Sequence, residues 1–307
     1  MKIAHNLNNL KRSVKRSVVA VGVFDGVHKG HQAIIKKVVR RSRLIGARSI
    51  LVTFDPHPLK ILKPSSSVPT VISLAHRVRL AKELGIDKVI VLKFTKALSR
   101  MSAEDFMRTL IEKLGLEEIY VGENFYFGKR GLTGARELSA MAERLGFKAH
   151  IIRSVRINGE VVSSSRIRAL IAKGDINKAA LFLGRKASVL GTVVSGAALA
   201  RELGYPTANI DPHHEAIPPA GVYAVRIKCG RDIYKGVLNI GTRPTFFNKG
   251  YAPEPVIEAH IFNFKKDIYG RDLEVFFIKK LREERKFQSV KALIAQIKMD
   301  EYAARRI

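Results

Sequence analysis

The pattern of hydrophobic residues changes once along this 307-residue chain, near residues 184–186. Before that point, short apolar runs typical of buried strands alternate with segments of helical periodicity. After it, strands bounded by turn residues follow one another, and only the segment from about Ser289 to Tyr302 has helical spacing. Repeated strand–helix units predict a parallel sheet covered by helices, whereas a series of strands closed by one helix predicts a small β-barrel. We therefore expect a Rossmann-like α/β domain over residues 1–186 and a β-barrel domain over residues 187–307.

Each half contains segments whose periodicity predicts one element. The strands predicted for the first half are Val18–Val21, Ser49–Phe54, Lys88–Phe94, Glu118–Gly122 and Ala149–Val155. The helices predicted there are Leu74–Leu84, Ser102–Leu114, Thr133–Leu145, Arg166–Ala172 and Ile176–Leu183, with one more beginning near His31. The strands predicted for the second half are Val189–Val194, Val222–Lys228, Ile233–Ile240, Val256–Asn263 and Leu273–Ile278.

The first predicted strand leads into the segment Gly22–His31, which has the pattern G-x-F-D-G-x-H-x-G-H. A strand, a glycine-rich loop and a helix N-terminus together bind phosphate, because free backbone N–H groups and the positive helix end point at the anion. His28 and His31 are three residues apart, so on a first helical turn both would reach one phosphoryl group. The other candidate phosphate- and nucleotide-binding residues of this loop are Gly22, Phe24, Asp25, Gly26 and Gly30.

Other interpretations of this loop remain open. Two histidines near a helix start are more often solvated or hydrogen-bonded locally. The sequence contains no Walker-A pattern, so that route to phosphate is excluded. The histidines also lack the further ligands that a metal site needs, and we expect no structural metal.

Three more polar strings lie where the predicted sheet would present them to a ligand, at strand ends or a helix start. In Thr53–Pro58, the residues Phe54, Pro56 and His57 would form a wall of the cleft, although a proline-stiffened turn explains the string equally well. In Gly122–Gly128, Phe125 and Phe127 would stack on a flat ring of the ligand and Asn124 would hydrogen-bond to its edge. Alternatively, the aromatic residues pack this loop against the core. In Ser163–Arg168, the residues Ser164, Ser165 and Arg168 would cradle phosphate, although one serine could simply cap a helix.

The second half offers a weaker set of candidates. Thr207 and Asn209, in the string Gly204–Asn209, provide oxygen atoms suited to Mg²⁺ bound to a nucleotide, although the string alone is also a plain turn. Gly191, Gly196 and Pro206 complete the candidate nucleotide-binding set of this half. Glu258 lies in a predicted strand, where a lone glutamate usually faces solvent.

The composition of the chain indicates where in the cell we expect the protein. No run of 18 or more apolar residues is present, so we expect no membrane span. The N-terminal residues lack the apolar region of a secretory signal, and Cys229 is the single cysteine, which excludes an internal disulfide. We expect a cytoplasmic protein. The sequence leaves its oligomeric state open and is compatible with a monomer.

The net charge of +28 is unevenly distributed. Residues 1–186 contain 36 Lys/Arg and 14 Asp/Glu, a net +22, whereas residues 187–307 contain 19 and 13, a net +6. Such a field attracts nucleotides, flavin phosphates or nucleic acid, and it also suits a surface adapted to solubility or heat. The basic residues are scattered apart from the short clusters Lys11–Arg16 and Lys36–Arg43, so we do not expect nucleic acid as the main partner.

Taken together and in order, these strings resemble the prokaryotic bifunctional riboflavin kinase/FAD synthetase family over nearly the whole chain. GVFDGVHKGHQ, VTFDPHP, VGENFYFGKRGLTG and VSSSRIR resemble its adenylyltransferase module. GTVVSGAALARELGYPTANI, GVYAV, GVLNIGTRPTF, VIEAHIFNFKKDIYG and LREERKFQS resemble its riboflavin kinase module. Any single string is a weak signal, but two complete sets in family order are highly specific.

The resemblance implies a transferase that uses ATP, riboflavin and FMN with Mg²⁺. In its kinase half, Glu258 matches the general base that activates the riboflavin 5′-hydroxyl, and Thr207 and Asn209 match residues that hold Mg²⁺ and phosphate. In its adenylyltransferase half, His28 and His31 would stabilise the α-phosphate of a second ATP while FMN attacks it, which gives FAD and pyrophosphate. Ser164, Ser165 and Arg168 would hold the β- and γ-phosphates, and Asn124 with the aromatics Phe125–Phe127 would line the flavin or nucleotide pocket.

The chain departs from the family pattern at Ala200, where glycine is usual, and at Ser165, where threonine is common. The large positive charge is not a family requirement. Three alternatives stay open: a chain in which only one half is active, a nucleotidyltransferase acting on another phosphate ester, and a nucleic-acid-binding protein.

Overall fold

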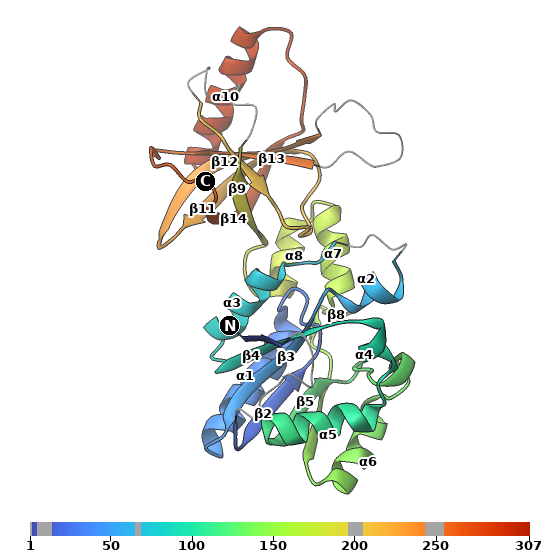
Figure 1. The fold of residues 1–307 in the computed structure, drawn as a ribbon. Helices are drawn as coiled ribbons and strands as arrows, with labels where there is room; N and C mark the ends of the chain where they lie inside the picture. The colour runs from blue at the N-terminus through green and yellow to red at the C-terminus, as the bar shows by residue number, and fades with distance from the viewer. Residues whose placement is uncertain (1, 5–13, 65–68, 196–204, 243–254) are drawn as a thin grey trace. The chain divides into compact units, whose positions relative to one another are not determined.

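The structure is a computed structural model of the chain, and it describes residues 2–4, 14–64, 69–195, 205–242 and 255–307. The chain forms two compact units (Figure 1). One, the α/β unit, comprises Met1–Thr70 and Leu74–Ser164, and the other, the barrel unit, comprises Val71–Ser73 and Ser165–Ile307. No helix among the described residues is long and apolar enough to cross a membrane.

The α/β unit contains a six-stranded parallel sheet in the order β1-β4-β3-β2-β5-β6. Its strands are β1 (Lys2–Ala4), β2 (Ser17–Val21), β3 (Arg48–Asp55), β4 (Lys88–Lys93), β5 (Leu116–Gly122) and β6 (Lys148–Ile152). Its helices are α1 (Lys29–Leu44), α2 (Pro58–Leu62), α3 (Leu74–Glu83), α4 (Lys96–Arg100), α5 (Ala103–Leu114) and α6 (Ala135–Leu145). The 3₁₀ turn η2 (Lys129–Gly131) and the hairpin β7 (Arg156–Ile157)–β8 (Glu160–Val161) complete it.

Helices cover both faces of this sheet. Val19 of β2 packs with Met107 and Leu110 of α5 in one buried cluster. Its neighbour Ala20 points to the opposite face because side chains alternate along a strand. On that face α1 packs against β2, β3 and β5 and buries Ile35. Because the central strands are buried on both sides, they appear in the sequence as continuous apolar runs rather than alternating ones.

The strand order positions the ligand site. From β2 the chain passes through α1 to β3 and on to β4 on one side, and β5 then returns to the other side of β2. In open parallel sheets, ligands bind beyond the carboxyl ends of the strands where this order reverses. The reversal lies between β2 and β5, so the loops that follow these two strands flank the expected site.

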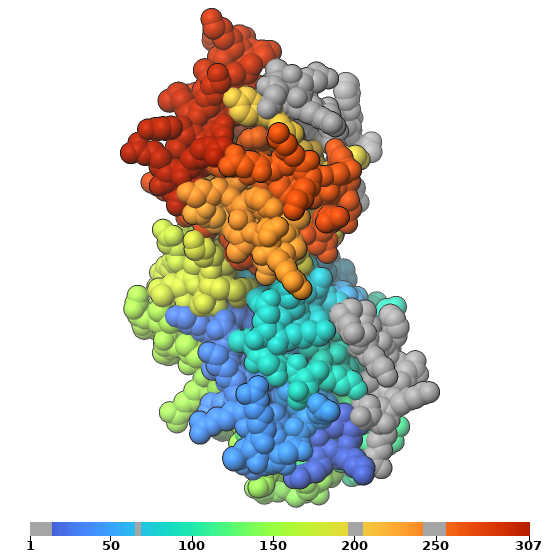
Figure 2. Space-filling model, turned by 90° about the vertical axis from the view of Figure 1, so that its left-hand side faces the viewer, coloured from blue at the N-terminus to red at the C-terminus, as the bar shows by residue number. Residues whose placement is uncertain are grey.

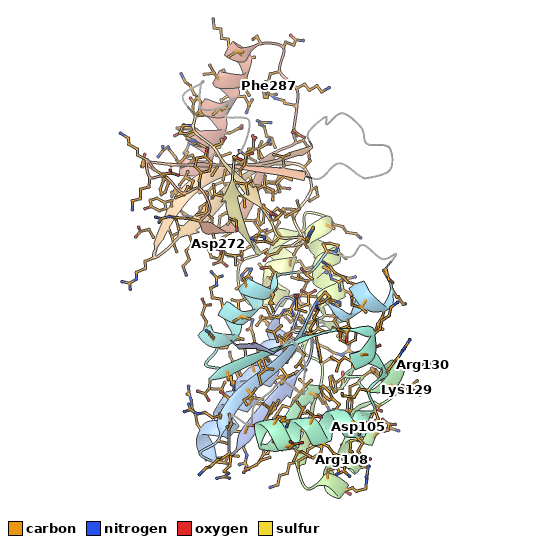
Figure 3. The ribbon with its side chains drawn as sticks, in the orientation of Figure 1. Asp105, Arg108, Lys129, Arg130, Asp272 and Phe287 are labelled. Atoms are coloured by element: carbon orange, nitrogen blue, oxygen red, sulfur yellow. The ribbon has the colours of Figure 1, made fainter. Side chains whose placement is uncertain are left out.

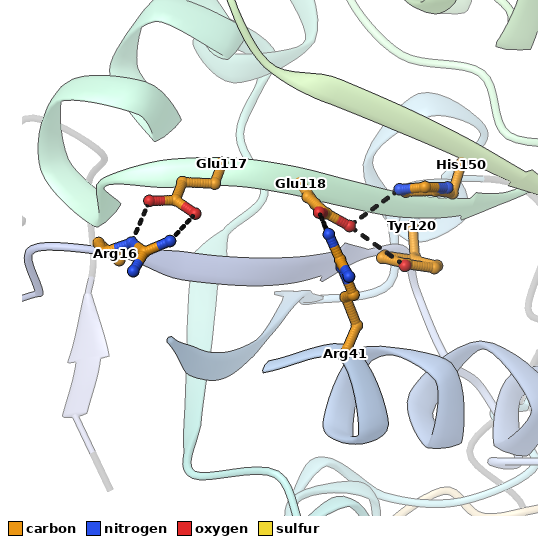
Figure 4. A network of polar contacts seen from close by, with 6 residues as sticks. All are labelled: Arg16, Arg41, Glu117, Glu118, Tyr120 and His150. Atoms are coloured by element: carbon orange, nitrogen blue, oxygen red, sulfur yellow. Dashed lines mark hydrogen bonds and ion pairs between the residues drawn. The ribbon is translucent and has the colours of Figure 1, made fainter. Parts of the chain in front are cut away.

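A buried carboxylate ties α1 to the sheet (Figure 4). Glu118 of β5 accepts hydrogen bonds from Arg41 Nε at 2.8 Å, from His150 Nε2 at 2.9 Å and from the Tyr120 hydroxyl at 3.3 Å. The rings of Tyr120 and His150 stack with centroids 4.3 Å apart. Burial alone would raise the pKa of Glu118, but the hydrogen bonds from Arg41 and His150 lower it below its usual value. The carboxylate therefore stays charged and holds α1, β5 and β6 together.

The barrel unit contains a closed barrel in the order β10-β13-β12-β11-β14-β9, and all its described strand pairs are antiparallel. Its strands are β9 (Ser188–Val194), β10 (Ala208–Asp211), β11 (Gly221–Cys229), β12 (Asp232–Thr242), β13 (Pro255–Ile261) and β14 (Asp272–Arg282). Helices α7 (Ser164–Ala172) and α8 (Ile176–Leu183) precede the barrel, and α10 (Val290–Arg305) follows it.

Strand alternation gives the barrel an apolar interior. Leu238 lies opposite Ala259 and next to Tyr223, and all three are fully buried. The intervening residues face outward, where α10 packs Ala304 against Ala224 and Phe262. The register between strands therefore decides which polar residues share the outer face.

The predicted fold class is confirmed, with differences in particular elements. The helix expected from Thr133 begins at Ala135, because Thr133 forms a β-bridge with Phe127. The strand expected to reach Val155 ends at Ile152. The predicted cap at Ser102 is present: Ser102 Oγ accepts from Asp105 N–H at 3.0 Å at the start of α5.

Short elements were missed altogether. They are β1, α2, α4, β10 and the hairpin β7–β8. None is longer than five residues, so its hydrophobic pattern does not repeat often enough to be recognised in the sequence. Partners in the tertiary structure specify these elements instead.

Candidate active site

The loop after β2 is tightly folded. Phe24, Gly26 and Val27 have positive φ angles of 53°, 91° and 40°. For a β-branched residue such as Val27 this conformation is strained, and strain of this kind clusters at functional sites. Phe24, Asp25 and Val27 are nevertheless almost fully buried. The loop is thus held in one shape by its surroundings.

His28 and His31 are brought together as predicted. His28 is the N-cap of α1, and its Nδ1 accepts a hydrogen bond from His31 N–H at 3.4 Å. The two imidazole rings stack with centroids 3.6 Å apart and an interplanar angle of 18°. The Phe24 ring lies 5.1 Å from that of His31. Both histidines therefore sit at the positive end of a helix, where developing negative charge is stabilised.

Gly30 leaves room for the His28 ring. A Cβ at this position would lie 3.1 Å from Cε1 of the His28 ring and 3.2 Å from its Nδ1. The half-buried Gly22 comes before the loop, where the backbone N–H donates to Val52 O at 3.1 Å. The glycines of the motif thus make room for the histidine ring and join the loop to β3.

The start of α7 contacts the histidine loop. Ser164 Oγ donates to the backbone oxygen of Asp25 at 2.6 Å. One turn further along α7, Arg168 Nη2 donates to Ser165 Oγ at 3.3 Å. Two of the predicted phosphate ligands are therefore adjacent on one helix, and the hydroxyl of the third supports the loop that carries the histidines.

The loop after β3 is a second neighbour. His57 caps α2, with its Nδ1 accepting from Leu59 N–H at 3.1 Å, and Pro56 is half-buried. Phe54 packs against the core cluster and meets Phe94 edge-on with centroids 5.8 Å apart. Core packing thus accounts for Phe54, and the helix cap accounts for one nitrogen of His57.

Sequence reasoning missed a buried arginine at this edge of the sheet. Arg77 of α3 is 1% exposed, and its Nη1 donates to Thr53 Oγ1 at 3.0 Å and to Phe54 O at 3.1 Å. Thr53 Oγ1 in turn donates to Val23 O in the histidine loop at 2.8 Å. Burial lowers the pKa of Arg77, and the charges of Asp25 and Asp55 oppose this. Nothing in the local sequence marks this arginine, because any exposed helix face carries similar residues.

The aromatic loop after β5 is divided between core and solvent. Phe127 is buried, and its ring stacks on that of Phe125 with centroids 5.2 Å apart. Tyr126 is 66% exposed. Asn124 Nδ2 donates to Ser154 Oγ at 3.5 Å. Lys129 and Arg130, which follow this loop, point away from the chain (Figure 3).

In the barrel unit, polar residues align across three strands. Asn209 of β10 lies directly opposite Glu258 of β13, and Glu258 lies opposite Asn239 of β12. Side chains of opposed residues share one face of the sheet. Asn209 is 8% exposed, and its Oδ1 has no hydrogen-bond partner among the described residues. A buried oxygen beside a carboxylate fits the ligand preference of Mg²⁺.

The remaining predicted residues of this half are partly described. Pro206 is exposed and Thr207 half-buried, and His260 Nδ1 donates to Pro206 O at 2.9 Å. Gly191 has a packing reason, since a Cβ there would lie 2.3 Å from the backbone oxygen of Asp211. Gly196 and Ala200 lie outside the described residues.

Both halves of the chain match families of known proteins. The family model for FAD synthetase matches residues 10–166, and the model for riboflavin kinase matches residues 183–307. A bifunctional riboflavin kinase/FMN adenylyltransferase of Pseudomonas fluorescens is 36% identical and covers 100% of this chain and 98% of its own length. The proteins of the same description from Bacillus subtilis and Escherichia coli K12 are 33% and 31% identical, each over 99% of this chain and over 96% and 97% of their own lengths.

A solved structure extends the similarity to the whole architecture. The protein described as a macrolide-efflux protein from Streptococcus pneumoniae is 30% identical, with a TM-score of 0.86 over 100% of this chain and 99% of its own. The two chains therefore share one fold from end to end. With both family models matched in order and full-length relatives in several bacteria, the chain belongs to the bifunctional riboflavin kinase/FMN adenylyltransferase family, and it phosphorylates riboflavin to FMN and adenylylates FMN to FAD.

Proposed function

We propose that each predicted domain contains one of the two active sites, with the adenylyltransferase site of residues 1–186 built around His28 and His31 and the kinase site of residues 187–307 built around Glu258 and Asn209. The observation that carries this proposal is the stacked histidine pair at the N-terminus of α1, next to the strand-order reversal. We place the boundary between the two domains at residues 186 and 187.

In the adenylyltransferase reaction, a phosphate oxygen of FMN attacks the α-phosphorus of ATP, and the bond from this phosphorus to the bridging oxygen of pyrophosphate breaks. The attacking group is already an anion, so no protein nucleophile is needed. His28 and His31 stabilise the negative charge that builds on the α-phosphate oxygens, helped by the positive end of α1. Ser164, Ser165 and Arg168 hold the β- and γ-phosphates of the leaving group.

The loops around the histidines bind the rest of the substrates. Gly22, Phe24, Asp25, Gly26 and Gly30 shape the phosphate loop. The flavin or nucleotide pocket is lined by residues of the two neighbouring loops, namely Asn124, Phe125, Phe127, Phe54, Pro56 and His57. Arg77 acts as a positioning residue, because its hydrogen bonds to Thr53 and Phe54 connect the two loops. A buried cation beneath the loop also favours a bound phosphate.

In the kinase reaction, Glu258 accepts the proton of the riboflavin 5′-hydroxyl as that oxygen attacks the γ-phosphorus of ATP and ADP leaves. Asn209 and Thr207 hold Mg²⁺ with the ATP phosphates, and Gly191, Gly196 and Pro206 contribute to this nucleotide site. When bound, Mg²⁺ neutralises charge on the phosphates. The opposition of Asn209 and Glu258 supports this assignment, since base and nucleotide site then lie side by side.

The test is a time course of purified protein with riboflavin, ATP and MgCl₂, with flavins separated by chromatography. FMN should appear first and FAD later, and EDTA should stop both until MgCl₂ is restored. Kinase turnover that continues in EDTA would contradict the Mg²⁺ site. We also propose that the enzyme works in the cytoplasm, where ATP is available, which cell fractionation would check.

A further inference from the structure

Helix α1 carries charge of one sign only. It contains six Lys/Arg residues and no Asp or Glu. Arg41 turns inward to the buried Glu118. Lys36, Lys37, Arg40 and Arg43 are exposed, and none forms an ion pair with a carboxylate among the described residues. Like charges four residues apart, such as Lys36 and Arg40, destabilise a helix. The spacing of Lys36 and Arg40 is therefore slightly unfavourable, whereas Arg43 in the last turn interacts favourably with the helix dipole. The four outward cations remain available to an anionic ligand.

The structure also joins basic residues that are separate in the sequence. A hollow of about 710 Å³ is lined by the cations Lys15, Arg16, Arg43 and Arg48, with Asp87 as its only carboxylate among the described residues. A second hollow of about 520 Å³ is lined by Lys36, Arg40 and Arg43 without a carboxylate among the described residues. Arg43 lines both hollows, so they adjoin. We call Lys15, Lys36, Arg40, Arg43 and Arg48 the α1 basic surface.

This surface is denser in cations than the chain as a whole. Six cations and one carboxylate line the two hollows, whereas the chain has 55 Lys/Arg and 27 Asp/Glu. Arg16 pairs with Glu117 and Arg48 with Asp87, so Lys15, Lys36, Arg40 and Arg43 are the lining cations without an ion pair among the described residues. In Figure 2 the blue surface of α1 adjoins the cyan surface of α3, consistent with Leu84, just after α3, lining the second hollow. The local excess is therefore more than the general basicity of the protein.

The α1 basic surface is far from the chemistry. At a rise of about 1.5 Å per residue, Arg43 lies roughly 22 Å along α1 from His28. The hollow around Arg43 and Arg48 opens at the start of β3, the end of the sheet opposite to the histidine loop. The phosphates of ATP and FMN at the proposed site are out of reach of Arg43 and Arg48. A separate anionic partner with several phosphates would compensate these cations.

We propose that the α1 basic surface binds the phosphate backbone of double-stranded nucleic acid without sequence preference. Several cations spread over neighbouring helical turns suit a ligand with regularly repeated charges. No aromatic residue lines either hollow among the described residues, so the base stacking that single-strand binding uses is missing there. Contacts to the backbone alone carry no sequence information.

The test is a titration of a fluorescein-labelled mixed-sequence duplex, followed by anisotropy between 50 and 200 mM KCl. We expect affinity to fall with salt, with a log–log slope of about −0.9 for each phosphate contact. The variant Lys36→Gln/Arg40→Gln/Arg43→Gln should bind roughly tenfold or more weakly at the lowest salt and show a slope about 2.7 smaller in magnitude. FMN and FAD formation should be unchanged, which shows that the variant folds.

A charge-matched control separates this surface from net charge. Arg231→Gln/Lys291→Gln/Lys298→Gln removes three exposed cations from the barrel unit. This control should bind the duplex like the wild type. The proposal is overturned if both variants weaken binding equally, if the wild type does not bind, or if a single strand binds more tightly than the duplex. It is also overturned if the α1 variant only lowers kcat/KM for ATP at low salt, since the surface would then steer substrate.

Discussion

Arg77 Nη1 donates a hydrogen bond to Thr53 Oγ1 across 3.0 Å, and neither residue is more than 1% exposed. The Thr53 hydroxyl in turn donates a hydrogen bond to Val23 O, at the start of the loop that carries the histidines. A guanidinium from α3 thus supports the end of β3 and, through Thr53, the loop that follows β2. Its place in the interior is tolerated because Thr53 and Phe54 accept its hydrogen bonds.

We first predict the effect of breaking this connection. Thr53→Val removes the hydroxyl but keeps the shape, and it leaves the buried Nη1 and Val23 O each without one partner, which costs about 1–3 kcal/mol of stability. FAD formation from FMN should fall about tenfold or more, mainly in kcat, because the histidines lose their position rather than their binding contacts. Steady-state kinetics with FMN and ATP measure this, and riboflavin kinase activity of the same protein is the internal control. Equal loss of both activities would mean that Thr53 only stabilises the fold.

The second prediction concerns the histidine pair. His31→Ala should lower FAD formation by a factor of about 10² to 10³, because a donor aimed at transition-state charge is lost. FMN formation should stay near the wild-type rate, since the kinase residues lie in the barrel unit. Separate assays of the two steps by flavin chromatography give both rates. If FAD formation survives, the assignment of the α-phosphate to this loop is wrong.

The third prediction is the reciprocal change in the barrel. Glu258→Gln keeps the size of the side chain and its place opposite Asn209 but removes the base. FMN formation should fall by about 10² or more, the scale of general-base catalysis, while FAD formation from added FMN continues. A variant that keeps the wild-type rate of FMN formation would exclude Glu258 as the base.

The fourth prediction uses the network around Glu118 (Figure 4). The folded protein lowers the pKa of this carboxyl, so the ionised form contributes stability above the unfolded pKa. This contribution disappears as the pH falls through the lower, folded pKa. Arg41→Met should lower the free energy of unfolding at pH 7, because it leaves a buried carboxylate without its main cation.

Thermal unfolding from pH 7 to pH 3 measures this effect. The difference in Tm between the wild type and Arg41→Met should shrink on the acidic side, where Glu118 becomes protonated in both. Arg108→Met, which removes an exposed cation paired with Glu104, is a matched control and should change Tm little. A constant difference across this range would show that Arg41 stabilises α1 by packing alone.

Local patterns in the sequence determined the two-part architecture and the position of the loop that carries the histidines. The apolar run Val18–Val21, the glycines of the loop and the helical period after it are short-range signals. Each acts within one or two turns of the chain, so the proximity of His28 and His31 followed from their spacing. For the same reason Ser102 was identified as a helix cap. The N-cap at His28 was not predicted, since the helix was expected to begin near His31.

Only the tertiary structure decided which distant residues meet. Arg77 and Thr53 are 24 residues apart, and Asn209 and Glu258 are opposed only because two strands pair in one register. A shift of one residue would place Glu258 on the other face of the barrel, so register cannot be inferred from a lone glutamate in a strand. The merging of Lys15, Arg43 and Arg48 around one hollow likewise depends on how the ends of β2, α1 and β3 come together. Periodicity records which face of an element is apolar, but contacts between elements depend on packing and strand order, which the local sequence does not encode.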